Sequence, residues 1–92
     1  MKTVHIDGKD KGNVMIFALS TCGWCRRTKL LMQKLGVSYD FVDVDLAPDN
    51  EKEEIDKAIS KWNPGGGFPT IVIDDKKCII GYREDEIKEL LG

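Results

Sequence analysis

Apolar residues of this chain gather in short blocks, separated by polar stretches rich in glycine, proline and charge. Residues 14–19 form a continuously apolar run, which is typical of a short strand buried on both faces. Residues 39–44 alternate as the two faces of a strand do. Residues 70–73 and 78–80 are predicted to form two more strands, joined by a hairpin turn at residues 74–77. The pattern therefore predicts four strands.

Three further segments show the spacing of amphipathic helices. The first ends at Gly36, a residue type typical of helix C-caps, and the second follows a helix-start signal at residues 47–50. The third closes the chain. Their apolar stripes consist of Thr28, Leu31, Met32 and Leu35 in the first helix, Ile55, Ala58, Ile59 and Trp62 in the second, and Ile87, Leu90 and Leu91 in the third.

The order of elements is strand, helix, strand, helix, strand, strand, helix. It predicts an α/β fold with a central mixed four-stranded sheet flanked by three helices that cover both of its faces. The first two strands should be parallel, and the closing hairpin should add antiparallel strands. Residues 4–6 are a candidate for an additional short N-terminal strand. Because the chain has 92 residues, we expect one domain over residues 1–92.

Composition and charge narrow the classes of function. The chain is 41% hydrophobic and 33% charged with a net charge of −2, which gives no reason to expect nucleic acid or a membrane as partner. The longest apolar run is too short to span a bilayer, and residues 1–12 contain no apolar signal core. We therefore expect a cytoplasmic protein, most simply a monomer. Three cysteines do not suit a disulfide-stapled secreted domain, so the close pair Cys22 and Cys25 points to redox chemistry or metal binding.

Cys22 lies where the buried strand passes into the first helix. The first N–H groups of a helix have no internal partner and, together with the helix dipole, favour a negative charge. A thiol there should lose its proton more readily than a free cysteine does. Arg26, Arg27 and Lys29 add positive field. Thiolate is the attacking species in disulfide exchange, so Cys22 is the expected nucleophile.

Cys25 follows at position i+3, on nearly the same helix face, from which it can reach Cys22 and close a disulfide. Cys25 is therefore the expected resolving residue, and the pair is expected to reduce protein disulfides by dithiol exchange. A zinc site needs about four ligands, and only Cys78 and His5 supplement the pair, so we expect no metal. Cys78 is more simply a small hydrophobic residue on a strand, and His5 a surface residue.

Three motifs of the chain recur in one known family: Ser20-Thr21-Cys22-Gly23-Trp24-Cys25 after the first strand, Phe68-Pro69-Thr70 before the third, and Ile80-Gly81-Tyr82 before the last helix. Through them the chain resembles the glutaredoxins of the thioredoxin superfamily. The resemblance implies a thioredoxin-like fold and a cis Pro69 that faces the cysteines and presents the backbone of Phe68 to a peptide or glutathione. The substrate-binding residues that it implies are Thr21, Gly23, Trp24, Phe68, Pro69, Thr70, Gly81 and Tyr82.

Two features of glutathione-using glutaredoxins are missing from this chain. No basic residue stands shortly before Cys22, and a single glycine, Gly81, takes the place of a Gly-Gly pair followed by an acid. In this respect the chain is more similar to the NrdH-type redoxins, which take electrons from a thioredoxin reductase. The expected partners are therefore disulfide-containing proteins together with either glutathione or a reductase as electron donor.

The residue after Cys22 is not proline, and this leaves a second interpretation open. Some glutaredoxins without that proline hold an iron–sulfur cluster between two subunits, with glutathione supplying ligands beyond one thiolate per chain. The alternative function is thus a cluster-binding glutaredoxin or a non-catalytic adaptor. Apart from the redox-active disulfide itself, we expect no cofactor.

Overall fold

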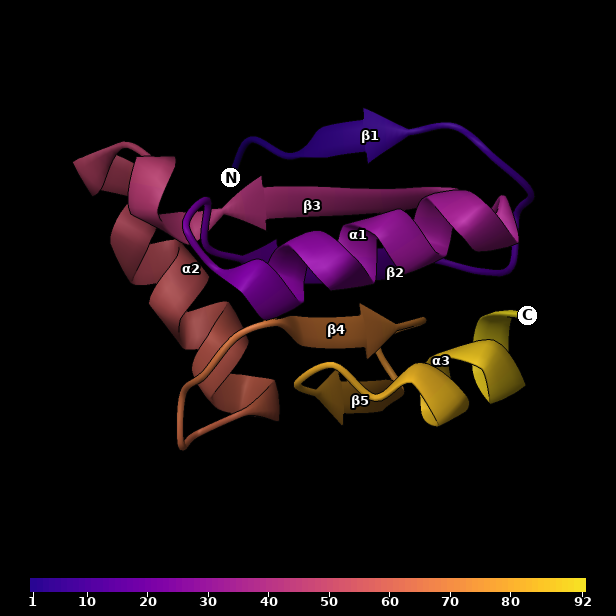
Figure 1. Cartoon of the computed structure of the whole chain (residues 1–92). Coiled ribbons are helices and arrows are strands. Elements are labelled where there is room, and N and C mark those ends of the chain that lie inside the picture. The colour runs from indigo at the N-terminus through magenta and orange to yellow at the C-terminus, as the bar shows by residue number, and fades with distance from the viewer.

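The computed structural model describes all residues, 1–92, and builds them around one five-stranded sheet (Figure 1). Its strands are β1 (Val4–Ile6), β2 (Val14–Ala18), β3 (Tyr39–Asp43), β4 (Thr70–Ile73) and β5 (Lys77–Ile80), in the spatial order β1-β3-β2-β4-β5. β2 and β3 are parallel, whereas the β1–β3, β2–β4 and β4–β5 pairs are antiparallel. The predicted mixed sheet and the additional N-terminal strand are both confirmed.

Three helices and one 3₁₀ turn complete the chain: α1 (Gly23–Leu35), η1 (Val44–Leu46), α2 (Asp49–Trp62) and α3 (Glu84–Leu91). α1 ends at Gly36, whose φ of 72° lies in the left-handed region that glycine adopts at no steric cost. Three predicted strand bounds are wrong by one residue: Leu19 lies after the end of β2, Lys77 already belongs to β5, and the strand that begins at Tyr39 ends at Asp43 because Val44 belongs to η1. A turn this short has no periodicity of its own, so the alternation of the strand runs on through its first residue.

The sheet is covered on both faces because successive residues of a strand point to opposite sides. On one side, α1 and α3 enclose a core that contains Ile16 of β2 and Ile87 of α3, both fully buried. On the other side, α2 encloses a smaller core that contains Phe17 of β2 and Ile55 of α2. Figure 1 shows α1 crossing in front of the sheet. None of the helices has the length and the apolar composition that crossing a membrane requires.

β2 and β5 end, and β4 begins, at the same end of the sheet. Phe17, near the end of β2, lies opposite Thr70 at the start of β4, and Thr70 lies opposite Ile80 at the end of β5. The loop that follows β2 at this end of the sheet leads through Cys22 into α1. The residues just before β4 and just after β5 therefore lie beside the loop that carries Cys22.

His5 connects the short strand β1 to its neighbour by charge. Its Nδ1 lies 2.6 Å from Asp40 Oδ1 on β3, and its Nε2 lies 2.9 Å from Asp7 Oδ1. The hydrogen bond to Asp40, with the charges of both carboxylates behind it, raises the pKa of His5 above its ordinary value. His5 is exposed, as predicted, and lies on the strand at the edge of the sheet.

We predict that β1 is held most firmly below about pH 6.5, the ordinary pKa of histidine, and loosens as the pH rises through the higher pKa of the folded protein. Protonated His5 attracts both carboxylates, and neutral His5 does not. Hydrogen-exchange protection factors of the β1 amides should fall as the pH rises above about 6.5, and the fall should be absent from His5→Gln. The same decline in both proteins would contradict the prediction.

Candidate active site

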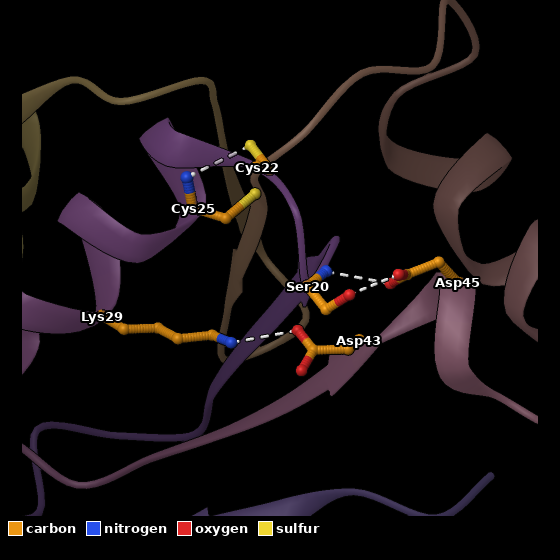
Figure 2. Close-up of polar contacts among 6 residues, drawn as sticks. All are labelled: Ser20, Cys22, Cys25, Lys29, Asp43 and Asp45. Carbon is orange, nitrogen blue, oxygen red and sulfur yellow. Dashed lines mark hydrogen bonds and ion pairs between the residues drawn. The ribbon is translucent and has the colours of Figure 1, made fainter.

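Cys22 is the residue at which the chain changes from extended to helical. It forms the N-cap of α1 with φ −86° and ψ 116°, and its Sγ accepts the N–H of Cys25 at 3.2 Å (Figure 2). Sulfur thus occupies the place that a serine or aspartate oxygen takes at other N-caps. The first turn of α1 holds no acidic side chain. The half-exposed sulfur therefore lies at the positive end of the helix dipole, with no acidic side chain in the same turn.

Cys25 differs from its partner in burial. Its side chain is part of the core between α1 and the sheet and has no exposed surface. Burial foremost, and then the adjacent Cys22 thiol, raises the pKa of the Cys25 thiol to about 12. The positive charge of Lys29 acts in the opposite direction. The two sulfurs therefore form an unequal pair, in which one is accessible and the other is protected and protonated.

Lys29 and Asp43 form an ion pair behind the cysteines. Lys29 follows Cys25 by one helical turn, and its Nζ lies 3.0 Å from Asp43 Oδ1 at the end of β3 (Figure 2). The two side chains are only 21% and 19% exposed, and the ammonium also lies 3.9 Å from the ring centroid of Phe41. Lys29 was predicted only as a source of positive field. The carboxylate that holds it comes from a distant strand and was missed.

Asp45 anchors the loop between β2 and α1. Its Oδ1 accepts the backbone N–H of Ser20 at 2.9 Å, and its Oδ2 accepts the Ser20 hydroxyl (Figure 2). These bonds hold the pKa of Asp45 below its ordinary value. Because Ser20 stands two positions before Cys22, the contact fixes the loop that leads to Cys22. No local signal marks Asp45, since its partner lies 25 residues earlier in the chain.

Pro69 follows a cis peptide bond after Phe68, as the family resemblance implied. Its carbonyl oxygen accepts the N–H of Gly81 at 2.8 Å, so the residues before β4 are connected to those after β5. Phe68 is half-buried and packs against both cores. The strand register places this segment beside the loop that carries Cys22.

A buried polar group supports the turn before Pro69. Asn63, only 4% exposed, donates from Nδ2 to Thr70 Oγ1 at 3.1 Å, and Thr70 Oγ1 donates to the Gly67 carbonyl at 2.9 Å. Thr70 was predicted as a binding residue, but its side chain is fully buried and directed into this network. Asn63 was predicted only as part of a chain break, because its role depends on a residue beyond the glycines.

Trp24 and Tyr82 form an aromatic pair next to Cys22. Their rings stack with centroids 5.7 Å apart and an angle of 23° between planes. The Arg27 guanidinium lies 5.3 Å from the centroid of the Trp24 ring on the same helix. Trp24 is 57% exposed, and Thr21 and Gly23 are exposed as well. Trp24 of the first motif and Tyr82 of the third are thus brought together by the fold.

The donor set does not fit a metal or cluster held by one chain alone. No group of three or more His, Cys, Asp or Glu side chains is placed to hold a metal ion. Cys22 offers one accessible sulfur, whereas Cys25 is fully buried and Cys78 lies on β5. An iron–sulfur cluster would therefore need ligands from outside this chain.

Comparisons with known proteins agree with this arrangement. The glutaredoxin family model matches residues 14–79. A glutaredoxin-like 8.6 kDa protein in the rubredoxin operon of Clostridium pasteurianum is 35% identical over 78 residues, which cover 85% of this chain and 96% of that protein. A glutaredoxin structure from Methanosarcina mazei has a TM-score of 0.91 and 43% identity, covering 100% of this chain and 89% of the other. The methanoredoxin of Methanosarcina acetivorans has a TM-score of 0.89 and 44% identity, covering 92% and 90%.

We predict that Asp45→Asn lowers the melting temperature at neutral pH. The amide is uncharged and has one oxygen in place of the two carboxylate oxygens that accept the bonds from Ser20. A carboxylate with a depressed pKa stabilises the fold above its unfolded value, about 3.9, and loses this effect as the pH falls through the lower folded value. The difference in melting temperature between wild type and variant should therefore shrink below about pH 4. Asp56→Asn, at an exposed position of α2, is the control. A difference that stays constant down to low pH would exclude this role of the charge.

Proposed function

This chain belongs to the glutaredoxin family and is a redox protein with a cysteine pair, and we propose that it reduces disulfides of other proteins by dithiol exchange. The observation that carries the proposal is the inequality of the two sulfurs. Cys22 is accessible at the start of α1, whereas Cys25 is buried behind it with a pKa raised to about 12. One sulfur is suited to meet a substrate, and the other can react only with its neighbour.

The first step uses Cys22 alone. Its thiolate attacks one sulfur of the substrate disulfide, the substrate S–S bond breaks, and a mixed disulfide forms with Cys22. The departing substrate sulfur leaves as a thiolate and takes a proton from water. The N–H of Cys25 and the helix dipole stabilise the sulfur of Cys22 before attack.

Cys25 carries out the second step. It gives up its proton to water, and its thiolate attacks Cys22 Sγ, which breaks the mixed disulfide and releases the second substrate sulfur as a thiolate that takes a proton from water. Two electrons have then passed to the substrate, and Cys22 and Cys25 share a disulfide. Lys29 favours the transient Cys25 thiolate by its charge, and Asp43 holds that charge in place. An external thiol or a reductase supplies the two electrons that restore the dithiol.

The segment around Pro69 is the proposed docking site for the substrate backbone. It lies beside Cys22, and Phe68 precedes β4 with its peptide bond to Pro69 in the cis form. An extended peptide can pair with this backbone in the manner of an added strand. Since both cysteines come from one chain, a monomer suffices for the reaction.

We predict that Cys22→Ser abolishes reduction of a protein disulfide, by about a thousandfold or more, because a hydroxyl is a far weaker nucleophile than a thiolate. Cys25→Ser should instead accumulate a mixed disulfide between Cys22 and its target, visible by mass spectrometry and reversed by a thiol. Cys78→Ser is the matched control and should keep full activity. Substantial activity in Cys22→Ser would refute the mechanism.

We also predict that a thioredoxin reductase with NADPH restores the dithiol faster than glutathione with its reductase. No basic residue precedes Cys22 in the loop, and Tyr82 and Arg83 stand where glutathione-using glutaredoxins have a second glycine and an acid. The measurement is NADPH consumption in the two coupled assays with the same disulfide substrate. Faster turnover with glutathione would show that other residues bind it.

A further inference from the structure

The exposed side of α1 concentrates positive charge beside the active site. The thirteen residues of the whole helix include four basic side chains and no acidic one, although the chain as a whole has a net charge of −2. Lys29 is directed inward to Asp43. Arg26, Arg27 and Lys34 are exposed, and none of them takes part in an ion pair within the chain. Three charges therefore have no ion-pair partner within the chain, and that of Lys34 also acts on Glu84 across the hollow described below.

Apolar surface accompanies these charges. Arg27, Leu30 and Lys34 follow one another at i, i+3 and i+7 and so share a helix face, and Leu30 is 56% exposed at its centre. Beside them, a shallow hollow of about 240 Å³ opens between α1 and the start of α3, with Tyr82 and Glu84 on its other wall. Exposed aromatic residues and arginines on such a surface are typical of protein interfaces.

The surface is continuous with the nucleophile. Arg27 lies over the Trp24 ring, Trp24 stacks on Tyr82, and Trp24 stands two positions after Cys22. The opposite side of the hollow has the opposite charge, because the first turn of α3 consists of Glu84, Asp85 and Glu86. A partner with negative charge is thus attracted to α1 and repelled from α3, which fixes its orientation across the hollow.

We propose that the α1 face, formed by Trp24, Arg26, Arg27, Leu30 and Lys34, docks an acidic segment of a protein partner and brings that partner's disulfide to Cys22. The inference rests on the proposed function and names the class of partner. Charge complementarity speeds diffusional encounter more than it adds affinity, and the effect is screened by salt. Three cations around an exposed leucine suit a protein segment with acidic and apolar side chains.

The test compares three synthetic peptides that contain the same disulfide, flanked by Asp and Leu, by Asn and Leu, or by Lys and Leu. Pre-reduced protein is mixed with each peptide in single turnover, so that no electron donor enters the measurement. We expect the acidic peptide to react about tenfold faster than the uncharged one at low salt, and this ratio to approach one at about 0.5 M salt.

Two variants with the same change in net charge separate docking from overall charge. Arg26→Gln/Arg27→Gln/Lys34→Gln should lose the preference for the acidic peptide, whereas Lys57→Gln/Lys61→Gln/Lys76→Gln, at exposed positions away from α1, should keep it. The ratio of acidic to uncharged rates is the readout, because it cancels effects of either variant on the thiol chemistry.

Equal rates for the acidic and uncharged peptides, or the same loss of preference in both variants, would overturn the docking proposal and leave dithiol exchange standing. If none of the peptides is reduced, the proposed function itself fails. Preference for the Lys peptide would show that the acidic start of α3, rather than α1, governs the approach.

Discussion

The site depends on how the central strand β2 ends. β2 is paired on both sides and covered on both faces, so the point at which the chain leaves it is fixed by the whole core. α1 begins within a few residues, and Cys22 becomes its N-cap. The unpaired N–H groups of that helix start need an acceptor, and the sulfur of Cys22 supplies it. The bond that caps the helix is thus also the bond that holds the Cys22 sulfur in place.

Burial then distinguishes two residues of the same type. Cys22 and Cys25 lie one helical turn apart, but the helix directs Cys25 into the core and leaves Cys22 at the edge. The raised pKa of Cys25 follows from loss of solvent, and the inward-directed Lys29 partly offsets it. The ordered sequence of attack and resolution in the proposed mechanism needs no further device, because each thiol can react only at its own stage.

Charge on α1 is divided in the same way between interior and surface. Lys29 is held by Asp43 beneath the helix, whereas Arg26, Arg27 and Lys34 face outward. The inner charge acts on the thiol chemistry, and the outer charges act on the approach of a partner. Composition alone does not separate these roles, since all four residues have the same sign and stand within one helix.

Local pattern was enough to predict the strands, the helices, the mixed sheet and the cysteine pair, because burial imposes strict periods on helices and strands. The cis Pro69 came from family resemblance rather than from periodicity. Tertiary structure decided which polar side chains become partners. Asp45 binds Ser20, Asp43 pairs with Lys29, and Asn63 binds Thr70 across the glycines. In each case the polar side chain reaches its partner only in the folded chain, and the spacing of the residues in the sequence does not predict the contact.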